Sequence, residues 1–189
     1  MDKKAVIFLD RDGVINRKAA PHSYITRWEE FQFLPGVIEA IRKFGEAGFL
    51  ILVVTNQRGI ARKICTKEQI NHLHDRMQRE LESQSAQING IYVCPHGDNE
   101  CECRKPKPGL LIQAEQDLNQ KGILIDKEKS WMIGDSFSDI EAGNVYGVQT
   151  ILISSSDFGK PDGVKCQYVC DNLIRAAGKI LSIQERKKR

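Results

Sequence analysis

A short apolar run that ends in two carboxylates constrains the fold of this chain most. Residues 5–9 are apolar, and Asp10 and Asp12 follow directly. Such a run is typical of a strand buried on both faces of a sheet. In extended chain, residues two apart point to the same side, so both carboxylates can aim at one spot. The pattern predicts a reactive edge at the carboxyl end of a strand, with a solvated turn as the competing interpretation.

Further apolar runs alternate with helical patterns. The expected strands cover residues 5–9, 49–54, 91–93, 131–133 and 149–153. The expected helices cover residues 36–47, the segment from the Thr66 capping box to Leu81, and residues 109–121. A short helix should begin at Ser138 or Asp139, and a last helix should be capped by Asn172. This alternation predicts an α/β fold, a Rossmann-like three-layer αβα sandwich with a mainly parallel sheet. Without repeats or a linker, residues 1–189 should form one domain.

Composition argues against several classes of protein. The net charge is only +3, and residues 185–189 hold part of it in what we expect to be a frayed, solvated tail. Binding to nucleic acid would require more basic surface. The chain has no apolar run near 18 residues and no secretory segment at its N-terminus. We therefore expect a cytoplasmic monomer that binds neither nucleic acid nor membrane.

Four polar clusters fall at expected strand ends or in neighbouring loops: Asp10/Asp12, Thr55-Asn56, Arg104-Lys105 and Asp135. Hydrolysis of phosphate monoesters is among the slowest uncatalysed reactions known. A carboxylate can attack an anionic phosphate only when cations neutralise the charge. A metal ion held by Asp10 and Asp135 would supply part of this neutralisation, and Lys105 would supply more.

The same clusters offer the remaining groups that such a reaction needs. Asp10 would form an aspartyl-phosphate. Asp12 would protonate the leaving oxygen and later deprotonate the attacking water. The Thr55 hydroxyl and the backbone amides at Thr55-Asn56 would bind the other phosphoryl oxygens. Coincidental turn clusters are the alternative interpretation.

A second signal is a loop rich in metal ligands. Cys94, His96, Cys101 and Cys103 lie within ten residues, enough for a closed, structural Zn²⁺ site. In a reducing cytosol such a cluster indicates metal binding rather than disulfides, with incidental free cysteines as the alternative. Cys65, Cys166 and Cys170 have no matching neighbours and are expected to be packing or surface residues. His72 and His74 are expected to be surface or partly buried packing residues of their helix.

The motifs together resemble those of the haloacid dehalogenase (HAD) superfamily of phosphatases. The matching segments are residues 10–14, Thr55-Asn56, Lys105 and residues 134–139. The resemblance implies that Asp10 is the nucleophile and that Asp12 is the acid/base, with its backbone carbonyl on Mg²⁺. It implies Asp135 as the second carboxylate ligand of Mg²⁺ and Asp139 as a supporting residue.

The cysteine loop and residues 53–62, 90–96 and 105–109 are similar to the capless branch that contains heptose bisphosphate phosphatases and histidinol-phosphate phosphatases. This resemblance implies catalytic Mg²⁺, structural Zn²⁺ and a small phosphorylated sugar as substrate, with the 7-phosphate of a heptose 1,7-bisphosphate as the group removed. The residues expected to contact substrate are Thr55, Asn56, Gln57, Arg58, Arg104, Lys105 and Ser136. Histidinol phosphate is the alternative substrate, and a polynucleotide 3′-phosphate ranks lower. A catalytically silent binding protein on the same fold is the alternative of another class.

Three departures from the heptose branch leave the substrate and its anomer open. The segment from His96 to Cys101 is shorter than in the better-known heptose enzymes and closer to the histidinol-phosphate type. Ser136 stands where some heptose enzymes carry a lysine. Residues 17–28 are longer than expected and should border the substrate.

Overall fold

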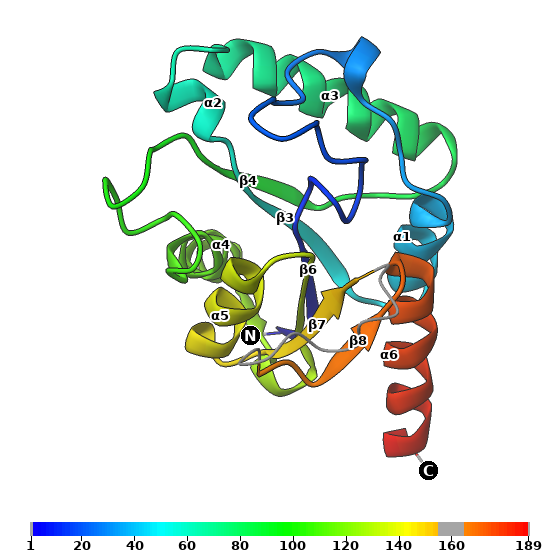
Figure 1. Cartoon of the computed structure of the whole chain (residues 1–189). Helices are drawn as coiled ribbons and strands as arrows, with labels where there is room; N and C mark the ends of the chain where they lie inside the picture. The colour runs from blue at the N-terminus through cyan, green and yellow to red at the C-terminus, as the bar shows by residue number, and fades with distance from the viewer. Residues whose placement is uncertain (1, 155–164, 189) are drawn as a thin grey trace.

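Six parallel strands form the centre of the structure, a computed structural model that describes residues 2–154 and 165–188 (Figure 1). Their order across the sheet is β4 (Gly90–Cys94), β3 (Leu50–Asn56), β2 (Val6–Leu9), β6 (Trp131–Gly134), β7 (Gln149–Ile153) and β8 (Tyr168–Cys170). Each neighbouring pair of strands is parallel. Because β2 lies between β3 and β6, Asp10 comes at the middle of the carboxyl edge of the sheet.

Helices cover both faces of this sheet, as predicted. Figure 1 shows α1 (Val37–Glu46) beside α6 (Leu173–Lys188), and α4 (Gly109–Gln120) beside α5 (Phe137–Tyr146). α1, α6 and α3 (Lys67–Ser83) pack in one core, whereas α4 and α5 pack in a second core. Strand β2 contributes alternate residues to each, with Ile7 and Leu9 in the first core and Val6 and Phe8 in the second. This arrangement confirms the three-layer αβα sandwich.

The short elements escaped the sequence analysis. β1 (Asp2–Lys4) pairs with β5 (Ile123–Ile125) in a separate two-stranded parallel sheet. β8, the 3₁₀ helices η1 (Trp28–Glu30) and η2 (Lys127–Lys129), and α2 (Arg58–Ala61) were also not predicted. These elements have only three or four residues and show no hydrophobic period, so tertiary contacts define them.

Helix ends mostly follow the predicted capping residues. The Thr66 hydroxyl accepts a hydrogen bond from the Gln69 amide, and the Gln69 side chain accepts one from the Thr66 amide. Asn172 caps α6 through the Arg175 amide. The tail predicted to be frayed and solvated is helical as far as Lys188, where α6 ends, while Glu185 and Arg186 are exposed as predicted; Glu, Arg and Lys are good helix formers. Arg189 lies outside the described residues. No helix in the described chain combines the length and apolar character needed to cross a membrane.

Candidate active site

The carboxylates and the lysine predicted to carry the chemistry lie together at the carboxyl edge of the sheet. Asp10 follows β2, Asp135 follows β6, and Lys105 lies in the loop between β4 and α4. Parallel strands end at the same edge, and reactive groups gather there in open α/β sheets. Asp10 and Lys105 are buried, and Asp135 is partly buried. The centre is therefore largely shielded from water.

Lys105 forms a buried bridge between two carboxylates. Its Nζ lies 2.7 Å from Oδ1 of Asp10 and 2.6 Å from Oδ1 of Asp139, and it also donates to the Val54 carbonyl. Burial alone would lower the pKa of Lys105, but the charges of Asp10 and Asp139 outweigh burial and raise it above its ordinary value. The ammonium group therefore stays charged inside the site.

Three carboxylates crowd around this edge. Asp10, Asp135 and Asp139 each place one oxygen within 4.8 Å of the others. Burial, opposed by Lys105, raises the pKa of Asp10 to about 7, and the neighbouring carboxylates add to the increase. Such crowding favours a bound cation, and an all-oxygen donor set suits Mg²⁺. The side chains present fit a divalent cation between Asp10 and Asp135, the two carboxylate ligands that sequence analysis predicted.

A second cation, Lys18, contacts Asp135. Its Nζ lies 2.6 Å from Oδ2 of Asp135, and its side chain is 54% exposed. Gly13 permits this approach: its φ is +92°, and a Cβ at this position would lie 1.7 Å from Oδ2 of Asp135 and 2.8 Å from Cε of Lys18. Lys18 lies in the segment 17–28, which was expected to border the substrate, but no role was predicted for Lys18 itself.

The Asp12 carboxylate is held by three side chains. Arg11 Nη2 lies 2.9 Å from both carboxylate oxygens, the Asn16 amide donates to Oδ1 at 2.9 Å, and the Gln57 amide donates to Oδ2 at 3.0 Å. Burial by itself raises the pKa of Asp12, but Arg11 and these hydrogen bonds leave it below the ordinary value. The metal role predicted for Asp12 concerns its backbone carbonyl, so this arrangement leaves that prediction open.

The His74 side chain contacts the buried Arg11 side chain. Arg11 is fully buried, and its Nη1 lies 3.1 Å from Nε2 of His74, a buried residue of α3. Arginine can only donate, so Nε2 of His74 must be the unprotonated acceptor. Burial, together with the Arg11 charge, lowers the pKa of His74 to about 3. The expectation of simple packing was therefore incomplete for His74, whereas His72 is exposed as expected.

The residues at the end of β3 hold neighbouring residues of the site in place through hydrogen bonds. Thr55 is buried, and its hydroxyl accepts a hydrogen bond from the Gln57 amide. Asn56 binds both backbone groups of Lys105: its Oδ1 accepts from the amide, and its Nδ2 donates to the carbonyl. The structure thus places Gln57 between Thr55 and Asp12, and Asn56 against the Lys105 backbone. Substrate contacts by these residues remain predictions.

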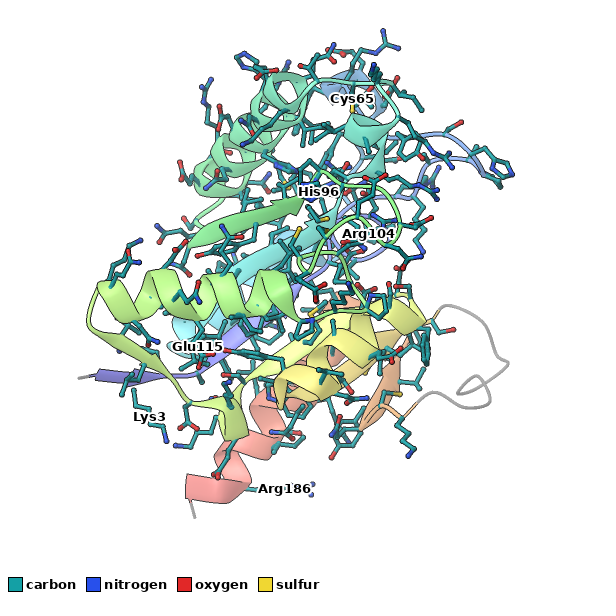
Figure 2. The ribbon with its side chains drawn as sticks, turned by 90° about the vertical axis from the view of Figure 1, so that its left-hand side faces the viewer. Lys3, Cys65, His96, Arg104, Glu115 and Arg186 are labelled. Carbon is teal, nitrogen blue, oxygen red and sulfur yellow. The ribbon has the colours of Figure 1, made fainter. Side chains whose placement is uncertain are left out.

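Two arginines share one carboxylate at the rim of the site. Arg58 Nη2 lies 2.7 Å from Oδ2 of Asp98, and Arg104 Nε lies 2.9 Å from Oδ1 of the same residue. Arg104 also donates to the His96 carbonyl at 3.3 Å, and Figure 2 shows both residues in the loop that follows β4. Asp98 therefore ties the cysteine loop to α2, a contact that sequence analysis did not foresee.

Ser136 caps α5. Its hydroxyl donates to Oδ2 of Asp139 at 2.6 Å, and the same oxygen accepts from the Ser136 amide at 3.1 Å. The helix consequently begins at Phe137, slightly earlier than predicted. This cap fixes Asp139, whose other oxygen faces Lys105.

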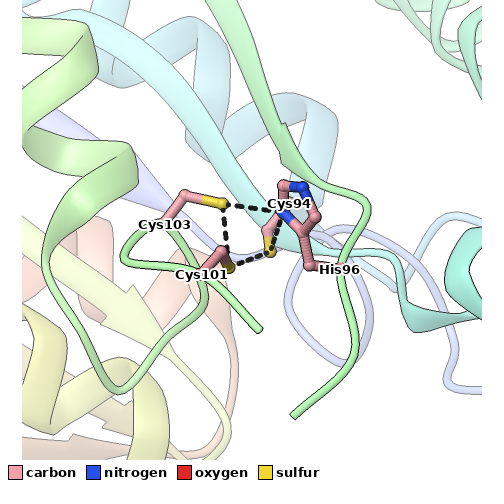
Figure 3. A group of neighbouring side chains, drawn as sticks. All are labelled: Cys94, His96, Cys101 and Cys103. Atoms are coloured by element: carbon pink, nitrogen blue, oxygen red, sulfur yellow. Dashed lines mark hydrogen bonds between the residues drawn. The ribbon is translucent and has the colours of Figure 1, made fainter. Parts of the chain in front are cut away.

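The four predicted zinc ligands converge on one point (Figure 3). The Sγ atom of Cys101 lies 3.6 Å from that of Cys94 and 3.2 Å from that of Cys103, and Nδ1 of His96 lies 3.3 Å from Cys103 Sγ and 3.8 Å from Cys94 Sγ. Around tetrahedral Zn²⁺, ligand atoms lie roughly 3.5–3.8 Å apart. The cluster therefore suits a closed tetrahedral metal site.

The other three cysteines lie outside this cluster. Cys65 is buried, and Cys166 and Cys170 are half-buried beside hydrophobic residues. Their prediction as packing or surface residues agrees with these positions.

Known proteins resemble this chain in sequence over most of its length. A family model described as polynucleotide kinase 3 phosphatase matches residues 5–169. D-glycero-beta-D-manno-heptose-1,7-bisphosphate 7-phosphatase from Yersinia pestis is 40% identical over 178 residues, which cover 90% of this chain and 89% of that protein. The chain belongs to the heptose bisphosphate phosphatase family. It is a phosphatase of the HAD superfamily, a hydrolase of phosphoric monoesters.

Solved structures of heptose bisphosphate phosphatases have the same fold. That of D,D-heptose 1,7-bisphosphate phosphatase from B. bronchiseptica, determined with magnesium and phosphate, is 30% identical with a TM-score of 0.79 and covers 97% of this chain and 99% of that one. A HAD phosphatase from Thermococcus onnurineus is 15% identical with a TM-score of 0.60, and covers 94% of this chain and 97% of that one. The second likeness concerns the fold alone.

Three contacts at this family's site were invisible in the sequence analysis. Lys18 on Asp135, Asp98 between the two arginines, and His74 on Arg11 join segments far apart or in irregular loops. The one available signal was the unusual length of residues 17–28, which carry Lys18. Neither a periodicity nor a motif marks Asp98 or His74.

Proposed function

We propose that this protein removes the 7-phosphate of D-glycero-β-D-manno-heptose 1,7-bisphosphate. The observation that carries the proposal is the buried Lys105 bridge between Asp10 and Asp139, beside a carboxylate cluster suited to Mg²⁺. This arrangement supplies a nucleophile together with the cations that its attack on phosphate requires. The names of the relatives, at about 40% identity over nine tenths of the chain, support the substrate and its β anomer.

The proposed chemistry runs in two steps. An oxygen of Asp10 bonds to phosphorus while the bond from phosphorus to the sugar oxygen breaks. Asp12, whose pKa lies below its ordinary value in the free protein, must first take up a proton from solvent and then gives it to the leaving oxygen. Water then attacks the phosphorus of the aspartyl-phosphate while the bond from phosphorus to the Asp10 oxygen breaks. Asp12 takes up a proton from the water, and inorganic phosphate leaves the regenerated Asp10 carboxylate. Lys105 stabilises the negative charge of the phosphoryl group in both steps. The Thr55 hydroxyl and the amides at Thr55-Asn56 bind the phosphoryl oxygens.

Two metal ions belong to this proposal. Asp10, Asp135 and the Asp12 carbonyl would hold Mg²⁺, which when bound neutralises part of the phosphoryl charge. Cys94, His96, Cys101 and Cys103 would hold Zn²⁺, which would pin the loop that carries Arg104. The clusters themselves support both assignments, since one has only oxygen donors and the other has sulfur and nitrogen donors.

The rim of the site would contact the sugar. We assign this role to Arg58 and Arg104, whose guanidinium groups suit a phosphate or sugar hydroxyls, with Gln57 and Ser136 nearby.

We further propose that the protein acts as a cytoplasmic monomer. The free thiols at the metal cluster favour a reducing compartment, and size-exclusion chromatography tests the monomer.

Phosphate release in the presence of Mg²⁺ tests the proposed function. The panel contains the α and β anomers of the heptose 1,7-bisphosphate, histidinol phosphate and an oligonucleotide with a 3′-phosphate. We expect kcat/KM for the β anomer to exceed that for every other substrate by about 100-fold, which is about 2.7 kcal/mol of transition-state discrimination. A preference for histidinol phosphate or for the oligonucleotide would show that this compound, and not the heptose bisphosphate, is the substrate. No release from any member, with Mg²⁺ bound, would favour a binding protein.

A further inference from the structure

Lys18 competes for a carboxylate that a metal ion would need. Its ammonium lies 2.6 Å from Oδ2 of Asp135, and Asp135 also belongs to the cluster of three carboxylate oxygens described above. Asp135 is 12% exposed, whereas Lys18 is 54% exposed, so only Lys18 has room to move. A divalent cation on Asp135 repels an ammonium at hydrogen-bond distance. Binding of the metal would thus push Lys18 toward solvent.

The space open to Lys18 is a cavity beside the catalytic edge. This cavity has a volume of about 480 Å³ and is lined by Gly13, Arg17, Lys18, Asp135 and Asp171 among others. It therefore begins next to the catalytic carboxylates and carries two cationic side chains. Once a metal neutralises Asp135, the two cations outnumber Asp171, so the cavity favours an anionic group. A phosphate group is the anion that an ammonium and a guanidinium bind well.

We propose that Lys18 is a specificity-determining residue that binds the second phosphate of the substrate after the metal ion has displaced it from Asp135. The inference rests on the proposed function for the identity of that phosphate. It makes metal binding and substrate binding sequential, because the same ammonium first occupies the metal's carboxylate and then the substrate's anion. The free protein meanwhile keeps its crowded carboxylates partly neutralised by Lys18.

The first test measures Mg²⁺ affinity without substrate, by isothermal titration calorimetry. In Lys18→Met the competing ammonium is gone, so we expect the Kd for Mg²⁺ to fall about threefold, the scale of a partly exposed ion pair. Lys121→Met, an exposed lysine at the end of α4, is the matched control and should leave the Kd unchanged. An unchanged Kd in Lys18→Met would overturn the displacement.

The second test compares the heptose 1,7-bisphosphate with the corresponding heptose 7-phosphate, which lacks the second anion. In Lys18→Met we expect the ratio of kcat/KM for the two substrates to fall about tenfold, mainly through KM of the bisphosphate, because a charge-assisted hydrogen bond is lost. Lys18→Arg keeps a cation and should restore most of the ratio. An equal loss for both substrates would overturn the specificity role.

The two tests separate this inference from the proposed function. If wild-type protein does not hydrolyse the bisphosphate, the proposed function fails. The Mg²⁺ titration still decides whether Lys18 competes with the metal ion for Asp135. If wild-type protein hydrolyses the bisphosphate with unchanged preference in Lys18→Met, only the inference fails.

Discussion

The Lys105 ammonium lies 2.7 Å from Oδ1 of Asp10, although 95 residues separate the two in the chain. Two structural features create this contact. Asp10 ends the central strand β2, and the Asn56 side chain binds the backbone amide and carbonyl of Lys105 from the end of the adjacent strand. The proposed nucleophile and its cation are therefore fixed relative to each other by the sheet rather than by local sequence.

The first prediction concerns the nucleophile. Asp10→Asn should lower kcat by at least about 10⁴-fold, because an amide cannot form the aspartyl-phosphate. The fold should survive, since Asn has the shape of Asp and Lys105 keeps its ion pair with Asp139. Phosphate release and a thermal melt check these two outcomes, with zinc content as the control. Activity equal to wild type would rule out the covalent mechanism.

The second prediction concerns the cysteine cluster. Cys101→Ser should lower the zinc content well below one ion per chain and reduce the free energy of unfolding by several kcal/mol, because closed zinc sites supply on the order of 10 kcal/mol. Elemental analysis and urea unfolding measure both. Cys65→Ser is the control, since Cys65 is a cysteine outside the cluster and its loss should leave zinc bound. Full zinc retention in Cys101→Ser would contradict the assignment of this ligand.

The third prediction concerns the bridge between the two arginines. Asp98→Ala removes the shared partner of Arg58 and Arg104, so their guanidinium groups should separate through mutual repulsion. We expect KM for the bisphosphate to rise about fivefold with kcat little changed, the scale of one or two partly exposed ion pairs. Asp75→Ala, at an exposed position on α3, should leave KM unchanged. A lower KM in Asp98→Ala would mean that Asp98 competes with the substrate instead.

The fourth prediction concerns acid stability and His74. Burial lowers the pKa of His74 to about 3, against 6.5 for an ordinary histidine, so between these values the unfolded chain binds a proton that the folded chain does not. Stability is therefore lost as the pH falls below about 6.5. At pH 5 the loss from this group is about 2 kcal/mol relative to neutral pH.

A matched variant isolates this contribution. His74→Gln keeps an acceptor for Arg11 but cannot titrate, so its unfolding free energy should fall less between pH 7.5 and pH 5 than that of wild type. Urea unfolding at both pH values provides the comparison. The same decrease in both proteins would show that His74 does not carry the acid sensitivity.

Patterns that repeat along the chain were readable from the sequence. The apolar runs of β2, β3, β4, β6 and β7 and the apolar stripes of the long helices identified the αβα sandwich. A strand buried on both faces is an unbroken apolar run, and a helix that packs on one side repeats its apolar residues every three to four positions. The capping residues Thr66 and Asn172 and the spacing of Cys94, His96, Cys101 and Cys103 are equally local signals. Elements of three residues, such as β1 and β5, carry no such period and were missed.

The sequence by itself determined the class of fold, the carboxylates of the candidate site and the loop of candidate metal ligands, because strand ends and ligand spacings are encoded within a few residues. Only the tertiary structure decided which polar groups meet: Lys105 between Asp10 and Asp139, Lys18 on Asp135, Asp98 between Arg58 and Arg104, and the neutral His74 on Arg11. Each of these contacts joins segments that the sheet or an irregular loop brings together. Electrostatic partners depend on distance in space, and one-dimensional patterns do not record that distance.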